Sequence, residues 1–152
     1  MKKHVVARVS DVPEGEHRIV EVNGRSIGIY NVGGTFRALL NRCPHQGAAL
    51  CKGAVVSELE SNAPGEFEFN PENKFVVCPW HGWEFELETG QSWFDADRTR
   101  VRKYDVTVEH GDEIAMAIDE AARQGGRVKG PYVAEVLQVE TDNDYVVVST
   151  PR

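Results

Sequence analysis

Two short runs of residues constrain this chain more than any other feature of its sequence. The first is Cys43-Pro44-His45-Gln46-Gly47, and the second is Cys78-Pro79-Trp80-His81-Gly82-Trp83. Each run sets one thiol and one imidazole a few residues apart in a segment containing Pro and Gly, which favours a tight turn. Two such turns brought together offer two sulfur and two nitrogen ligands to one metal centre. The rest of the chain must therefore fold so that the two turns meet.

The spacing of these ligands is Cys-x-His, then residues 46 to 77, then Cys-x-x-His, and both halves also share the Cys-Pro and His-x-Gly or His-Gly context. In spacing and context the sequence resembles the Rieske [2Fe–2S] family over about residues 4–110. The resemblance implies an all-β fold of antiparallel sheets with a cluster-binding lobe of two loops. It also implies one [2Fe–2S] cluster per chain, with Cys43 and Cys78 on the inner iron and His45 and His81 on the outer iron.

The expected reduction potential follows from the charge of the ligands. Two neutral imidazoles in place of two thiolates bring the oxidised cluster from a formal −2 to zero, which raises the potential into a family range of roughly −150 to +300 mV. In high-potential members a Ser and a Tyr hydroxyl donate to the cluster sulfurs, and the corresponding places here are Trp83 and Phe85. Only backbone N–H groups then remain as donors, so we expect a potential near the low end. The residues expected around the cluster are Gln46, Gly47, Trp80, Gly82, Trp83 and Phe85.

Zinc is the competing metal, because two Cys and two His also make a good tetrahedral set. Classical zinc spacings pair Cys with Cys and His with His, whereas each run here mixes the two. The third cysteine, Cys51, has no second thiol left to join and is expected to be a buried small hydrophobe. In Rieske proteins of respiratory cytochrome bc complexes a disulfide ties the two loops together, and its positions here correspond to Ala48 and Trp80. The missing bridge fits a reducing compartment.

The composition is ordinary for a soluble globular protein. Its 152 residues, 41% hydrophobic and 27% charged, predict a single domain over residues 1–152. The net charge of −7 argues against nucleic acid as a partner. It could steer the chain towards a basic redox partner, although a solvated acidic surface is the commoner reading. No apolar stretch is long enough to span a bilayer, so we expect no membrane contact and a cytoplasmic protein.

Strands and turns are predicted before the first ligand run. A strand over Val5–Val9 is followed by strands at 18–22 and 25–30, which flank Asn23-Gly24, the strongest short hairpin signal. A further turn at residues 31–34 leads into a strand at 35–40. This three-stranded meander delivers the chain to Cys43.

The region expected to bind the cluster spans residues 41–94 and contains a long insertion at residues 52–74. The insertion is acidic and carries Pro64-Gly65, which predicts a surface loop. A contact with a partner, or shielding of the cluster, is the alternative. Phe67 and Phe69 alternate with glutamates and allow one short strand.

A hairpin is predicted to carry the second ligand run at its tip, with strands at 74–77 and 83–87. All three tryptophans, Trp80, Trp83 and Trp93, lie close to this run. We expect their bulk to exclude water from the inner iron, and Trp80 could also contribute to a docking face. A strand at 101–109 completes the family-like part.

Residues 111–152 lie outside the resemblance and are predicted to form a C-terminal appendage. Apolar residues at helical spacing over 113–124, stopped by Gly125-Gly126, predict a short helix. Segments 133–140 and 145–149 are predicted to form a hairpin that covers the edge of the sheet.

The sequence offers no site for substrate chemistry of its own. Histidines His4, His17 and His110 are scattered singly, and no flavin or dinucleotide glycine fingerprint is present. The resemblance implies an electron carrier between a flavin-dependent reductase and a terminal oxygenase or other oxidoreductase. A tightly bound electron-transfer subunit of a larger oxidoreductase is the alternative. A redox or iron–sulfur sensor, or a zinc-binding structural module, is the third.

Overall fold

The computed structural model describes residues 2–44, 47–80, 82–92, 99–123, 132–133 and 140–151. Of the residues singled out above, His45, Gln46, His81 and Trp93 lie outside the described residues. No helix in the described part of the chain combines the length and the hydropathy that crossing a membrane requires.

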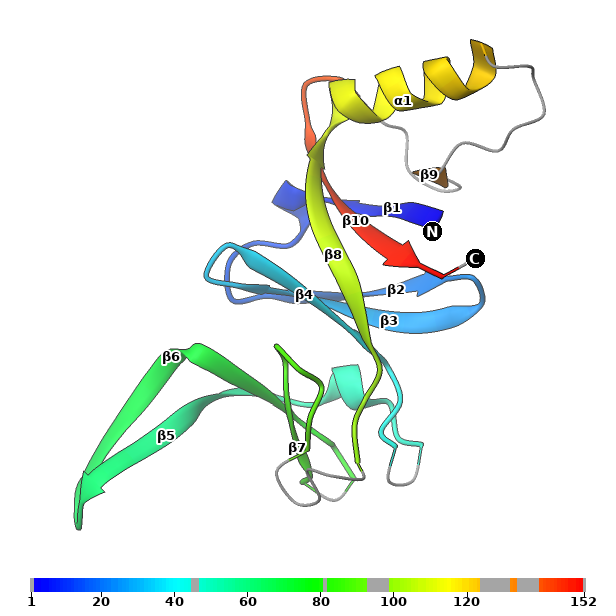
Figure 1. Ribbon diagram of the computed structural model, residues 1–152. Coiled ribbons are helices and arrows are strands. Elements are labelled where there is room, and N and C mark those ends of the chain that lie inside the picture. The colour runs from blue at the N-terminus through cyan, green and yellow to red at the C-terminus, as the bar shows by residue number, and fades with distance from the viewer. Residues whose placement is uncertain are drawn as a thin grey trace.

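A seven-stranded sheet forms the larger part of the molecule, with strand order β2-β3-β4-β8-β10-β1-β9 (Figure 1). All its neighbouring strands are antiparallel except β1 and β9, which run parallel. Short 3₁₀ turns lie at Val9–Asp11 and Leu50–Lys52. The strands are β1 (Lys2–Arg8), β2 (His17–Val22), β3 (Arg25–Val32), β4 (Thr35–Leu40), β8 (Lys103–His110), β9 (Tyr132–Val133) and β10 (Asp144–Thr150).

The predicted meander is confirmed. β2 and β3 pair from His17 opposite Tyr30 to Val22 opposite Arg25, and β3 then pairs with β4. The turn between β2 and β3 places Asn23 at φ 53° and Gly24 at φ 73°, the left-handed pair that matches the twist of a two-residue hairpin.

Strand β3 separates two apolar cores. Ile27 and Ile29 pack into a core beneath the seven-stranded sheet, together with Ala38, Tyr104, Val146 and Val148. Tyr30, whose side chain points to the opposite face, packs into a second core that contains Cys43 and Cys78. The meander therefore packs against the cluster lobe with one face and against the core of the seven-stranded sheet with the other.

The predicted C-terminal hairpin is wrong. Strand β10 lies between β8 and β1, and the described part of the other segment, β9, pairs with β1 instead (Figure 1). The physical reason is burial on both faces: Tyr145, Val146, Val147 and Val148 are all fully buried. Four consecutive buried residues are typical of a central strand, whereas an edge strand alternates apolar and polar residues.

The helix predicted for this region is confirmed as α1 (Gly111–Arg123). It follows β8 directly, and Ile114 packs against Val5, Tyr145 and Val147. The last residue of β8, His110, pairs with the first residue of β10, Asp144, and Gly111 N–H donates to the Asn143 carbonyl (2.8 Å). Residues 111–143 are therefore inserted in the sequence between two adjacent strands, and within this insertion β9 adds to the edge of the same sheet beside β1.

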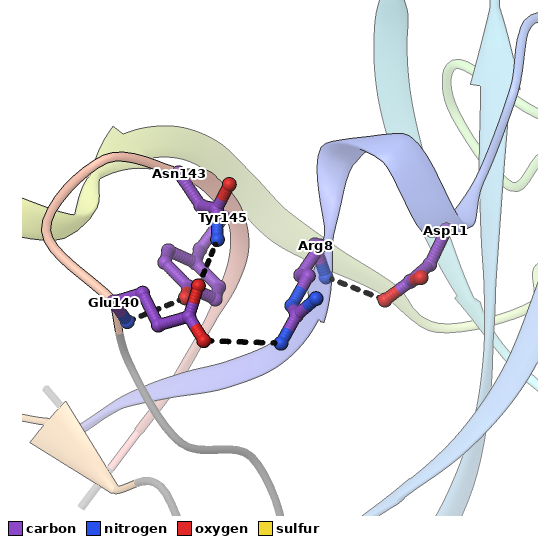
Figure 2. A network of polar contacts seen from close by, with 5 residues as sticks. All are labelled: Arg8, Asp11, Glu140, Asn143 and Tyr145. Carbon is purple, nitrogen blue, oxygen red and sulfur yellow. Dashed lines mark hydrogen bonds and ion pairs between the residues drawn. The ribbon is translucent and has the colours of Figure 1, made fainter.

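A polar network fixes the return of the chain into β10 (Figure 2). The backbone N–H of Glu140 donates to the hydroxyl of buried Tyr145 (2.6 Å), and Asn143 Nδ2 donates to Glu140 Oε2 (2.9 Å). Arg8 at the end of β1 forms a 3.8 Å ion pair with Glu140. Because that ion pair is exposed it contributes little, and the bond to Tyr145 is the stronger constraint.

Replacing residues 111–143 with Asn-Gly is expected to leave the fold and the metal centre intact. The two flanking strands already pair at His110 and Asp144, and Asn-Gly supplies the turn that joins such a pair. The replacement removes the edge strand β9, the buried Ile114 side chain (about 1.5–3 kcal/mol) and the bond from Glu140 N–H to the Tyr145 hydroxyl (about 1 kcal/mol), so the Tm should fall by roughly 5–15 °C. Thermal unfolding and the visible spectrum of the variant measure both effects. A variant that cannot retain the metal centre would show that the insertion is an integral part of the core.

A smaller, three-stranded sheet carries the second ligand run. Its order is β5-β6-β7, with β5 (Val55–Ala63), β6 (Glu66–Val77) and β7 (Glu84–Glu86). β6 and β7 pair from Phe75 opposite Glu86 to Val77 opposite Glu84, which confirms that Cys78 begins the tip of a hairpin.

The predicted surface loop at residues 52–74 is wrong, because β5 and β6 form a long two-stranded ribbon. Figure 1 shows this ribbon projecting from the body of the molecule. Phe67 and Phe69 lie within the twelve-residue strand β6. The register shifts between the pairs Ser57–Lys74 and Glu58–Asn70, so that β6 carries extra residues around Pro71. Proline has no N–H to give to a ladder, which accounts for the bulge at this place.

Candidate metal centre

Cys43 and Cys78, the two predicted thiol ligands that the structure describes, share one environment. Their exposed fractions are 1% and 2%, and neither forms a disulfide. Both belong to the apolar core that also contains Tyr30, Leu50, Phe85, Leu87 and Val101. The fold thus brings the beginnings of both ligand runs into a single water-excluding core.

The two ligand runs form the same hydrogen-bonded turn. Cys43 N–H donates to the Ala48 carbonyl (2.8 Å), and Gly47 N–H donates back to the Cys43 carbonyl (2.8 Å). In the second run Cys78 N–H donates to the Trp83 carbonyl (2.8 Å), and Gly82 N–H donates to the Cys78 carbonyl (2.9 Å). Each turn therefore has its cysteine first and its glycine fifth.

The glycines are required in these turns because their backbone is left-handed. Gly47 has φ 80° and Gly82 has φ 71°, a region that residues with a Cβ rarely adopt. The N–H groups of these two glycines close the turns by donating to the Cys43 and Cys78 carbonyls.

A direct backbone contact joins the two turns where a disulfide is missing. Val77 N–H, one residue before Cys78, donates to the Ala54 carbonyl (2.9 Å). A Cβ on Gly53 would lie 1.7 Å from the Val77 carbonyl oxygen, so only glycine allows this approach. The exit of the first run is thereby held against the entry of the second. Sequence analysis missed Gly53, because nothing in one sequence marks which glycine meets a distant strand.

Asn41 closes the base of the first run and was also missed. Its Oδ1 accepts the backbone N–H of Cys51 (2.7 Å), and its Nδ2 donates to Ser26 Oγ (3.0 Å). Asn41 N–H also donates to the Ser26 carbonyl (2.8 Å). The only available signal was an Asn two residues before a turn, a position where Asn often bonds to nearby backbone.

The residues predicted to surround the centre differ in exposure. Phe85 is fully buried in the cysteine-containing core and Trp83 packs against it partly buried. Neither side chain has a hydroxyl. Trp80 is 61% exposed, so it cannot be one of the side chains that seal the core and instead lies at the surface beside the second run.

Cys51 is fully buried, as expected of a structural thiol. Its Sγ lies 3.9 Å from the Leu39 carbonyl oxygen, and burial raises the pKa of the thiol. Tyr30 packs in the same core, and burial likewise raises the pKa of its hydroxyl well above the usual range. Both groups therefore stay protonated and neutral near pH 7.

The described residues by themselves contain no group of three or more His, Cys, Asp or Glu placed to hold a metal ion. The two predicted histidine ligands, His45 and His81, lie outside these residues. The described geometry accordingly supplies two thiols at equivalent positions of two matched turns.

Comparisons with known proteins agree with this arrangement. The model of the Rieske [2Fe-2S] domain family matches residues 2–105. The ferredoxin subunit of 3-phenylpropionate/cinnamic acid dioxygenase from Escherichia coli (strain K12) is 33% identical over 112 residues, covering 74% of this chain and 91% of that protein. The solved structure of the ferredoxin of carbazole 1,9a-dioxygenase from Nocardioides aromaticivorans IC177 superposes with a TM-score of 0.55 at 25% identity, covering 72% of this chain and 91% of the other.

The fold, the paired cysteine turns and these matches define the class, and the chain belongs to the Rieske [2Fe–2S] domain family. A Rieske domain implies one [2Fe–2S] cluster. The described residues fit this group: two cysteines that form no disulfide lie buried in one core, and thiolates are the ligands that hold such iron. The surrounding side chains, Phe85, Leu87 and Val101 among them, supply the dry apolar packing that such a centre needs.

Proposed function

We propose that this chain is a Rieske-type ferredoxin that carries single electrons from a flavin-dependent reductase to the oxygenase component of a ring-hydroxylating dioxygenase. The observation that carries the proposal is the 33% identity, over most of both chains, to the ferredoxin subunit of a dioxygenase. The match to the ferredoxin of carbazole 1,9a-dioxygenase supports it.

The proposed cluster ligands are Cys43, His45, Cys78 and His81. The burial of Cys43 and Cys78 in one core supports their assignment to the inner iron. His45 and His81 follow within the same turns and are assigned to the outer iron. When bound, the cluster accepts and releases one electron at a time. The two turns would hold the cluster through Cys43, His45, Cys78 and His81, and the buried side chains around the two cysteines would exclude water from it.

A low reduction potential is proposed from the residues around the cysteines. Phe85 and Trp83 occupy the places where high-potential members of the family have hydroxyl donors, and neither can donate an O–H bond. The N–H groups of Gly47 and Gly82 are also engaged in closing the turns. With fewer donors to the sulfurs, the reduced cluster is less stabilised.

The proposed docking face for the oxygenase is the tip that carries Trp80. A tryptophan 61% exposed beside the proposed ligands is the type of residue that anchors protein interfaces. An exposed aromatic ring next to the cluster also lets the partner exclude water around the outer iron on docking.

Replacing Trp80 with Ala is expected to slow electron transfer to the oxygenase without changing the potential. Loss of an interface hot spot costs about 2 kcal/mol or more, so the second-order rate constant should fall roughly 30-fold. Met116→Ala is the matched control, because Met116 is 71% exposed on α1, away from the two ligand turns. Stopped-flow mixing of the reduced ferredoxin with the oxygenase measures the rate. Equal rates for both variants would place the docking face elsewhere.

A cytoplasmic location is part of the proposal. Cys43, Cys51 and Cys78 form no disulfide, and the positions of the loop-bridging disulfide hold Ala48 and Trp80. Such usage of cysteine is typical of a reducing compartment.

Electron paramagnetic resonance of the dithionite-reduced protein, followed by reduction with NADH and a flavin-dependent ferredoxin reductase, tests the function. The expected result is a Rieske-type signal and reduction by the reductase at catalytic reductase concentrations. A colourless protein without a signal would overturn the assignment in favour of zinc. A protein that copurifies in a stable stoichiometric assembly would favour the fixed electron-transfer subunit.

A further inference from the structure

A cleft of about 690 Å³ lies between the meander and the ribbon, apart from the two ligand turns. One wall comes from the turn before β2 and from β3 and β4, with Glu14, Glu16 and Arg37. The other wall comes from the root of the ribbon and the turn after β7, with Val55, Lys74 and Glu88. Of the described residues, neither the proposed ligands Cys43 and Cys78 nor the residues predicted around the cluster line it.

The meander wall of this cleft is rigid. Gly15 N–H donates to the Asn31 carbonyl (2.9 Å), and Asn31 N–H donates to the Glu16 carbonyl (3.0 Å). The Asn31 side chain donates to the Val12 carbonyl (2.8 Å) and is buried. The cleft is thus largely formed before any ligand arrives, which lowers the cost of binding.

The charge available to a ligand in the cleft is negative. Arg37 is paired with Glu88 at 3.8 Å, whereas Lys74, which donates to the neutral Ser57 Oγ (2.5 Å), keeps its positive charge. Glu14 and Glu16, both exposed on the meander wall, outnumber this one lysine. The ribbon beyond the cleft carries Glu58, Glu60, Glu66, Glu68 and Glu72 and no Lys or Arg between residues 57 and 73.

The strand that contributes Val55 is an edge strand. β5 pairs only with β6 among the described strands, so one row of its backbone N–H and C=O groups faces no other described strand. Val55 and Val56 are each 37% exposed at the root of this edge. An extended peptide can add to such an edge by main-chain hydrogen bonds and place alternate side chains in the neighbouring cleft.

We propose that this cleft is a second docking site, which binds an extended, Lys- or Arg-bearing segment of a partner protein along the edge of β5. The acidic wall selects the positive side chains and the strand edge selects the extended backbone. A second copy of this chain is the weaker candidate, because two molecules of net charge −7 repel each other. The site does not depend on the cluster, so it can fail while the electron-transfer function stands.

Fluorescence anisotropy with a labelled eight-residue peptide of alternating Lys and Val tests the site on the cluster-loaded full chain. The peptide is expected to bind, and a Glu-Val peptide of the same length is not. The double variant Glu14→Gln, Glu16→Gln should weaken binding of the Lys-Val peptide roughly fivefold and reduce its salt dependence. Lys74→Gln should tighten binding, because it removes a positive charge from the cleft.

The matched control is the double variant Asp112→Asn, Glu113→Gln, which removes the same charge from exposed positions at the start of α1. It should change the affinity less than twofold. Equal weakening by both double variants would overturn the site, because the peptide would then respond only to net charge. Tighter binding of inorganic phosphate than of the Lys-Val peptide would also overturn it. So would dimerisation of the chain without peptide, measured by sedimentation and abolished by the Glu14→Gln, Glu16→Gln variant, because a second copy of this chain would then be the occupant. A Lys-Pro peptide, which lacks half of the N–H donors, should bind more weakly than Lys-Val, and equal binding would exclude the strand edge.

Discussion

Cys78→Ser is expected to yield a protein without its cluster, whereas Cys51→Ser is expected to retain the cluster in full. All three cysteines are buried and none forms a disulfide, so the same substitution at each tests which thiol binds iron. A serine hydroxyl ionises far less readily than a thiol and is a harder, poorer ligand for this iron. The measurements are iron and sulfide per chain, visible absorption and electron paramagnetic resonance after reduction. Cys43→Ser should behave as Cys78→Ser does.

The position of Cys51 makes it a strict control. It lies eight positions after Cys43, and its backbone N–H, which a Ser retains, is held by Asn41. Its Sγ faces the Leu39 carbonyl oxygen, to which a serine hydroxyl can also donate. Burial raises the pKa of the Cys51 thiol, so it has little thiolate to offer a metal near pH 7. Loss of colour in Cys51→Ser would show that the ligand assignment is incomplete, and a coloured Cys78→Ser would refute it.

The sequence predicted the parts of the fold that local chemistry determines. Asn23-Gly24 demands a two-residue turn, and the structure has one. The helical spacing that includes Ile114 predicted α1, because one apolar stripe needs a partner surface. Pro and Gly in the two ligand runs predicted turns, and both turns have the same pattern of backbone hydrogen bonds.

Long-range pairing accounts for the errors. The apolar run around Val147 indicated a strand, but its place between β8 and β1 depends on partners far away in the sequence. The acidic composition around Pro64 suggested a loop, while the alternation of Phe67 and Phe69 with glutamates was the signal of the ribbon. The acidic composition of this segment therefore led to the wrong prediction of a loop, whereas the period-two alternation correctly indicated a strand. The sites of Gly53 and Asn41 depend on contacts between turns, which one sequence does not display.

Gly53→Ala is expected to destabilise the protein strongly and to release the cluster. Gly53 has φ −77° and ψ 163°, a backbone that any residue can adopt. Glycine is therefore required here only because there is no room for a Cβ atom. The new Cβ would lie 1.7 Å from the Val77 carbonyl oxygen, and the strand that delivers Cys78 would have to move away. Overpacking of this kind costs about 1–3 kcal/mol, and loss of the bond from Val77 N–H to the Ala54 carbonyl adds about 1 kcal/mol.

Two controls separate the close contact from other effects of the same substitution. Gly65→Ala introduces strain at φ 84° in the ribbon turn but meets no atom within 4 Å, so it should cost only about 1–2 kcal/mol and leave the cluster in place. Ala54→Ser alters the exposed neighbour of Gly53 and should be close to neutral. Thermal unfolding should show a fall of on the order of 10 °C for Gly53→Ala, with iron content falling in parallel. Because the two ligand turns lack a disulfide, a Gly53→Ala protein as stable as Gly65→Ala would mean that something other than this contact holds the turns together.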